Sequence, residues 1–126
     1  MAEREIRLLD SKTYWESDES HALMSFLSDK GFTNEELEAD DFGRFHGPRM
    51  YIRVGILESQ REFFKPVYGE IISIDKEGKL HVNTADGIGN YPLPLSYLRQ
   101  VEVKRISRND FLEEKDKYGG ALKGVS

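Results

Sequence analysis

Only histidines and carboxylates could hold a metal ion in this chain, because it contains no cysteine. Asp40, Asp41 and His46 lie within seven residues, a spacing that suits a carboxylate–histidine metal site or an acid–base pair. A metal site normally needs a third ligand held in geometry by its surroundings. The same residues suit a polar connector between a helix and a strand, and the sequence favours that interpretation.

The other candidate groups for chemistry are weaker. His81 falls at an outward position of a predicted strand, near Asn83 and Asp86, and is expected to face solvent. Residues 87–89 resemble part of a phosphate-binding turn but lack the third glycine and the following helix. His21, at the start of an acidic helix, suits a surface position. No catalytic constellation is assembled by spacing, so the sequence favours a non-catalytic protein with no cofactor and no metal.

Aromatic and basic side chains in the second half of the chain form the first candidate interaction surface. Phe63 and Phe64 are adjacent in a polar loop and cannot both face the same core direction, so one is expected to be exposed. Arginine and tyrosine suit planar stacking and carboxylate pairing. The candidate partner-binding residues on this rim are Arg61, Phe63, Phe64, Lys65, Tyr68, Tyr91 and Tyr97.

Acidic side chains in the first third form the second candidate surface. Residues 1–42 carry four basic and twelve acidic residues, a balance of −8, whereas residues 43–106 have a balance of +3. Dense acidic runs are usually solvated faces. The functional alternatives are a surface that docks a basic partner, or one that imitates the phosphate spacing of nucleic acid. The candidate residues on this surface are Glu35, Glu36, Asp40 and Asp41.

The acidic third is predicted to be helical. Leu23, Phe26 and Leu27 share one helical face, and Gly31 stands where a helix cap is expected, which predicts a helix over residues 18–30. A capping box opens a shorter helical turn, and a brief strand is predicted near the start of the chain. These two elements cover residues 34–39 and residues 5–9.

From residue 49 onward the pattern switches to alternation with period two, which is typical of strands. Gly78 can supply the positive φ of a tight hairpin turn. Ser107 and Asp110 form a capping box that opens a last helix, expected to stop at the glycine pair 119–120. The predicted strands cover residues 50–57, 67–75, 80–84 and 100–106, with an edge segment at 91–94 and one helical turn at 95–99. The predicted core residues are Met50, Ile52, Val54, Ile72, Ile74, Leu80, Val82, Val101 and Val103.

The length of 126 residues, with 38% hydrophobic and 33% charged residues, describes one compact globular domain. Its predicted parts are an acidic helical extension packed on a barrel (residues 1–48), the barrel itself (49–106) and a C-terminal helix with a tail (107–126). The first ten residues offer neither the apolar core of a signal peptide nor a membrane span. We therefore expect a cytoplasmic protein that does not insert into a membrane.

The order of these elements resembles the SH3-like barrel found in KOW and Tudor-type modules and in the small photosystem I accessory subunit. The matching parts are Met50–Leu57, Gly69–Asp75, Leu80–Thr84, Leu95–Leu98 and Gln100–Val103. The resemblance implies a mainly β fold: a five-stranded SH3-like barrel with helical additions at both ends. The chain lacks the basic decoration of KOW modules and shows no evident four-aromatic cage of the Tudor type, so RNA and methyl-lysine binding are not carried over.

These observations predict a non-catalytic protein-interaction module, or an accessory or regulatory subunit, that acts through the aromatic and basic rim, the acidic helix, or both. A nucleic-acid-binding barrel is the first alternative; the +3 middle section favours it and the net charge of −5 opposes it. An acidic inhibitor of a nucleic-acid-binding protein, of the kind that mobile elements encode, is the second. The interaction module and the acidic inhibitor would both have a protein as partner, whereas the nucleic-acid-binding barrel would not.

Overall fold

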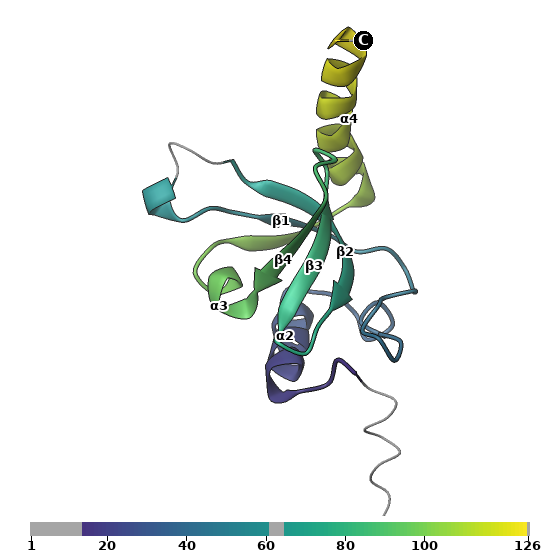
Figure 1. The fold of residues 1–126 in the computed structure, drawn as a ribbon, viewed down its shortest axis with the longest axis vertical. Coiled ribbons are helices and arrows are strands. Elements are labelled where there is room, and N and C mark those ends of the chain that lie inside the picture. Colours follow the sequence, from purple (N-terminus) through teal and green to yellow (C-terminus); the bar gives the residue numbers. More distant parts are fainter. Residues whose placement is uncertain (1–13, 61–64, 126) are drawn as a thin grey trace, which may run out of the picture.

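A five-stranded antiparallel sheet forms the centre of the molecule (Figure 1). The computed structural model describes residues 14–60 and 65–125, with the side chains of the last helix described as far as Tyr118. The strands are β1 (Tyr51–Val54), β2 (Val67–Ile74), β3 (Lys79–Thr84), β4 (Asn90–Pro94) and β5 (Val103–Ile106). The helices are α2 (Asp18–Asp29), the short 3₁₀ turn η1 (Glu58–Gln60), α3 (Leu95–Leu98) and α4 (Arg108–Val125).

The spatial order of the strands is β4-β3-β2-β1-β5, so β4 and β5 are the two edges of the sheet. The predicted strand-rich fold with helical additions is confirmed. The sheet itself is not a closed barrel, because β4 and β5 do not pair within the described part of the chain. The strand expected over residues 5–9 lies outside the described residues.

The predicted hairpin between β2 and β3 is confirmed in detail. Gly78 has a φ of 78°, as the tight turn requires. The Asp75 carboxylate accepts hydrogen bonds from the backbone N–H groups of Glu77 and Lys79, both at 3.0 Å. A side chain at Gly78 would also meet the Cβ atom of Glu19 at 2.9 Å, so the turn packs closely against α2.

A β-bulge in β2 decides which isoleucines enter the core. The register pairs Ile71 with Val82 and Ser73 with His81, which leaves Ile72 as the extra residue of the bulge. Ile71 is therefore buried and Ile72 is only half-buried. The prediction of Ile72 as a core residue is wrong, because strict alternation was assumed across the bulge. Val101, also predicted as core, is half-buried and packs against the core from outside β5.

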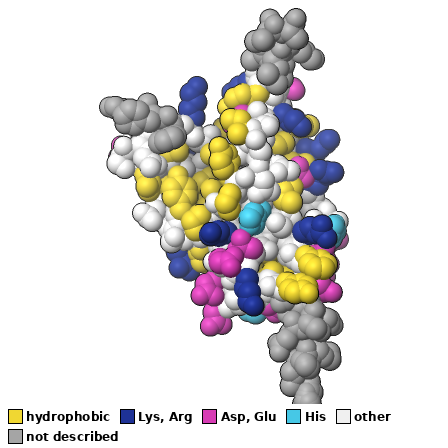
Figure 2. Space-filling view, in the orientation of Figure 1, with side chains coloured by type: hydrophobic (Ala, Val, Ile, Leu, Met, Phe, Trp, Pro, Cys, Tyr) yellow, Lys and Arg dark blue, Asp and Glu magenta, His cyan; other side chains and the backbone are white. Residues whose placement is uncertain are grey.

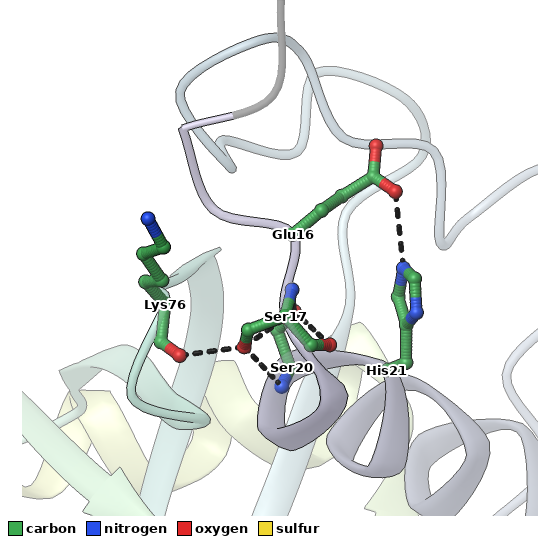
Figure 3. Close-up of polar contacts among 5 residues, drawn as sticks. All are labelled: Glu16, Ser17, Ser20, His21 and Lys76. Carbon is green, nitrogen blue, oxygen red and sulfur yellow. Dashed lines mark hydrogen bonds and ion pairs between the residues drawn. The ribbon is translucent and has the colours of Figure 1, made fainter. Parts of the chain in front are cut away.

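The start of α2 is hydrogen-bonded to the turn between β2 and β3 (Figure 3). Ser17 and Ser20 form a capping box, and the Ser17 hydroxyl donates a hydrogen bond to the Lys76 carbonyl oxygen at 2.6 Å. Leu23 and Leu27 have no exposed area, so the acidic helix contributes two side chains to the main core. The predicted helix over residues 18–30 is confirmed.

The segment after α2 is linked to β5 by an ion pair in which the carboxylate is buried and the arginine is exposed. Glu36 forms the predicted capping box with Thr33. Its other carboxylate oxygen accepts a hydrogen bond from Arg105 of β5 at 2.8 Å. Arg105 also donates to the Gly31 carbonyl oxygen and lies over the Phe32 ring. The backbone after Thr33 makes a turn and no further helix.

The helix α4 packs its first turns on the sheet and then extends beyond it (Figure 1). Its capping box of Ser107 and Asp110 is confirmed, and the Phe111 ring lies 4.9 Å from the Tyr51 ring. The expected end at residues 119–120 is wrong, because the helix continues to Val125. Glycine lowers helix stability by about 1 kcal/mol, but it ends a helix only when it adopts a left-handed cap. No helix of the described residues has the length and apolarity needed to cross a membrane.

Candidate protein-interaction site

An apolar pocket lies between the loop after β1, the β3–β4 turn, α3 and α4. Its volume is about 510 Å³. Hydrophobic side chains gather on the face of the molecule where β4 and α3 lie (Figure 2). The residues that line the pocket are Val54, Ile56, Gln60, Lys65, Pro66, Val67, Tyr68, Thr84, Ala85, Asp86, Tyr91, Leu93, Tyr97, Glu114 and Tyr118.

Four tyrosines line this pocket, and each comes from a different element: β2, β4, α3 and α4. Tyr91 and Tyr118 are the more open pair, with 42% and 36% of their surface exposed. Tyr68 and Tyr97 are half-buried. The buried Val54 and the half-buried Val67 and Leu93 add apolar side chains to the pocket lining.

Two of the tyrosines are positioned by contacts outside the pocket. The Tyr97 hydroxyl donates a hydrogen bond to the Gly55 carbonyl oxygen at 3.5 Å. The Arg53 guanidinium lies 5.9 Å from the centre of the Tyr68 ring and 3.6 Å from the Glu102 carboxylate. These contacts restrict the ring orientations, which lowers the entropy cost of ligand binding.

Charged groups stand at the border of the pocket. The Asp86 carboxylate accepts hydrogen bonds from the Thr84 hydroxyl at 2.5 Å and from the Ile88 backbone N–H at 2.9 Å. Glu114 accepts from Lys117 at 3.1 Å and from the Tyr118 hydroxyl at 3.4 Å. Loss of solvation, and then the nearby carboxylates of Glu114 and Asp86, raise the pKa of Tyr118. Tyr118 is therefore a neutral hydrogen-bonding group at physiological pH.

The structure brings together part of the predicted rim. Lys65, Tyr68, Tyr91 and Tyr97 all line the pocket. Arg61, Phe63 and Phe64 lie outside the described residues, so their predicted role is untested. The sequence reasoning missed the contribution of α4, because Glu114 and Tyr118 were assigned to a separate C-terminal helix. Tyr118 stands four residues after Glu114, a helical spacing that could have marked a shared face.

The predicted acidic residues differ in exposure. Glu36 is buried and paired with Arg105, so it stabilises the fold, whereas Glu35 is exposed. Asp41 is exposed, and its backbone carbonyl accepts a hydrogen bond from the Tyr14 N–H. The role of these carboxylates in binding stays a prediction.

Asp40 organises the connector between α2 and the sheet. Its carboxylate accepts hydrogen bonds from the backbone N–H groups of Arg44 and Phe42, and it lies 2.7 Å from the His46 Nε2 atom. The hydrogen bond from the Arg44 backbone, with the contact from His46, lowers the pKa of Asp40 to about 2. The described residues contain no group of three or more possible metal ligands. The arrangement agrees with the polar-connector interpretation.

The other two histidines also pair with acceptors. His81 lies 2.7 Å from Asp75 through Nε2 and 3.1 Å from the Asn90 side-chain oxygen through Nδ1. His81 was expected to face solvent, but its side chain is only 27% exposed because Asp75 and Asn90 lie against it. His21 Nε2 lies 3.1 Å from Glu16 at the start of α2 (Figure 3).

The chain was also compared with known proteins. No protein-family model, no curated protein and no solved structure matches it. Any functional inference therefore depends on the geometry of the chain itself.

Proposed function

We propose that this chain is a non-catalytic protein-interaction module, or an accessory subunit of a larger assembly, whose tyrosine-lined pocket receives an extended segment of a partner protein. The observation that carries the proposal is the convergence of Tyr68, Tyr91, Tyr97 and Tyr118 on one open apolar pocket. Tyrosine is enriched among the residues that dominate binding energy, because it offers a large apolar surface and a hydrogen-bonding group.

The β4 edge of the sheet, which lies beside the pocket, supports the pocket as the docking site. A partner strand could add to an exposed edge only through free backbone N–H and C=O groups. Pro92 and Pro94 occupy two of the five positions of β4 and lack N–H groups. This edge is therefore a poor template for strand addition, whereas the pocket beside it presents side chains for recognition.

We further propose that the sheet belongs to the SH3-like layout. Three observations support this: β1 pairs with both β2 and β5, the strand order is β4-β3-β2-β1-β5, and the one-turn helix α3 precedes the last strand. Such small sheets host unrelated activities, so the functional proposal depends on the pocket and not on the layout.

The test is selection of peptides from a random phage-displayed library on the intact chain. Selected peptides are then titrated against Tyr91→Ala, Tyr118→Ala and the control Tyr14→Ala. Tyr14 is 63% exposed and does not line the pocket. We expect both pocket variants to lose about tenfold or more in affinity while Tyr14→Ala binds normally. Failure to select any peptide, or equal binding by all three variants, would contradict the proposal.

Nucleic-acid binding is a second candidate, favoured by a second pocket of about 620 Å³ that Arg49, Arg105 and Arg108 line. Two of these arginines are already paired: Arg49 with Glu70 at 2.8 Å and Arg105 with Glu36 at 2.8 Å. Pairing reduces the positive charge available to a phosphate backbone. We therefore rank this function second.

A further inference from the structure

We propose that the pocket recognises a basic side chain, arginine or lysine, within an apolar segment of the partner, and that Asp86 receives its charge. This inference rests on the proposed function and names the chemistry of the ligand. Three features support it: the carboxylate of Asp86 in the pocket lining, the oxygen atom of Asp86 that accepts no hydrogen bond from the described residues, and the exposed tyrosine rings.

The charged groups at the pocket and its border are two acids, Asp86 and Glu114, and two bases, Lys65 and Lys117, so their formal charges balance. Lys117 stands next to the border and already pairs with Glu114. Asp86 has no ion pair within residues 14–60 and 65–118. The pocket therefore offers one carboxylate that no described cation contacts directly, and a cationic side chain of a partner could pair with it.

The geometry of Asp86 leaves one oxygen for a ligand. Its Oδ1 atom accepts the hydrogen bonds from Thr84 and Ile88, which orient the carboxylate. Among the described residues, Oδ2 receives no hydrogen bond. A guanidinium or ammonium group at Oδ2 would form a charge-assisted hydrogen bond, which is shorter and stronger than a neutral one.

The tyrosine rings offer a second group that can attract a cation. Arg53 already lies over Tyr68, whereas Tyr91 and Tyr118 keep more than a third of their surface exposed. A cation over such a ring face is attracted by the π-electrons. The methylene groups of arginine or lysine can pack along the aliphatic walls while the charged end reaches Asp86. Asp86 and Tyr118 both line the pocket.

The experiment uses four pools of fluorescent nonapeptides with randomised leucine, valine, proline and phenylalanine around a central arginine, lysine, citrulline or glutamine. Citrulline keeps the shape of arginine but has no charge. Binding to the intact chain is followed by fluorescence anisotropy. The variant is Asp86→Asn, which retains an oxygen acceptor for Thr84 and Ile88. The matched control is Asp41→Asn, an exposed carboxylate that does not line the pocket.

We expect the arginine and lysine pools to bind at least about fivefold more tightly than the citrulline and glutamine pools. Asp86→Asn should remove that preference, and Asp41→Asn should keep it. Equal binding of all four pools, still weakened by Tyr91→Ala, would overturn this inference and leave the proposed function intact. Absence of binding by every pool, or binding insensitive to Tyr91→Ala, would contradict both. Preference for a nucleic-acid probe over all peptides would also overturn the inference.

Discussion

The Tyr97 hydroxyl lies 3.5 Å from the Gly55 carbonyl oxygen, a contact between residues 42 positions apart in the sequence. It connects α3 to the loop after β1, and both segments line the tyrosine pocket. Gly55 is itself held in place, because its N–H donates to the Glu102 carbonyl oxygen at 2.7 Å. Added side-chain atoms at Gly55 would meet that oxygen at 3.2 Å, so the approach of the two segments favours glycine.

The first prediction concerns this contact. Tyr97→Phe removes the hydroxyl and leaves the ring, so the free energy of unfolding should fall by no more than about 1 kcal/mol. Tyr97→Ala removes the ring as well, and it should weaken binding of a pocket peptide by about tenfold or more. Urea unfolding and anisotropy titration measure the two effects. A Tyr97→Ala variant that binds peptide like the natural chain would exclude α3 from the site.

The second prediction concerns the bulge in β2. Ile71→Ala should lower the free energy of unfolding by about 2–5 kcal/mol, because Ile71 is buried in the main core. Ile72→Ala should cost clearly less, since Ile72 is half-buried. Chemical denaturation of the two variants gives a direct comparison. A larger loss for Ile72→Ala would mean that the strand register differs from the one described.

Much of the fold could be predicted from local signals. The alternation of apolar and polar residues predicts the strands. The capping residue Ser17 and the terminating Gly31 predict α2, and Gly78 predicts the hairpin turn. The bulge at Ile72 could not be predicted, because it depends on the pairing register of β2 with β3, and no residue type in β2 indicates that register. The continuation of α4 past two glycines shows that helix-weakening residues do not by themselves end a helix.

The candidate site could be predicted only in part. Tyr68, Tyr91 and Tyr97 were recognised because aromatic residues recur beside predicted strands. Asp86 and Tyr118 were missed as members, since only the packing of α4 against the sheet brings them to the same pocket. Glu36 was assigned to an acidic surface, but its partner Arg105 lies 69 positions away and could not be inferred from local charge.

The third prediction concerns pH. Partial burial of Asp75 disfavours its charged form, but the hydrogen bonds from His81 and the Lys79 backbone outweigh this, so its pKa is lowered. A lowered pKa in the folded state adds stability above the unfolded value of about 3.9, and that stability is lost as pH falls through the folded value. Asp75→Asn should therefore be less stable than the natural chain near neutral pH.

The stability difference between these two proteins should begin to narrow as pH falls below the unfolded value of about 3.9, and it should vanish as pH falls through the lower folded value. Thermal unfolding at a series of pH values measures it. Asp40→Asn is a parallel case that should respond to pH in the same direction, because the pKa of Asp40 is also lowered, to about 2, by contacts in a different segment. If the stability difference between Asp75→Asn and the natural chain stayed constant down to low pH, the ionised carboxylate of Asp75 would contribute nothing to stability.

The fourth prediction concerns nucleic acid. The intact chain should bind a double-stranded DNA probe weakly at about 150 mM salt, because the acidic first third repels phosphate. Deleting that third is not a usable test, since Leu23 and Leu27 belong to the core. Neutralising the exposed Glu35 and Asp41 keeps the fold and should raise affinity modestly. Submicromolar, steeply salt-dependent binding by the unaltered chain would promote the nucleic-acid function.

The central claim is that the tyrosine-lined pocket is where a partner segment binds, and chemical-shift mapping by NMR tests it most directly. A peptide selected on the intact chain is titrated into isotope-labelled protein. The account predicts that the largest shifts occur at Tyr68, Tyr91, Tyr97 and Tyr118 and at the backbone of Asp86. Shifts concentrated instead at the exposed, stacked pair of Tyr14 and Phe42, with the pocket tyrosines unchanged, would contradict it.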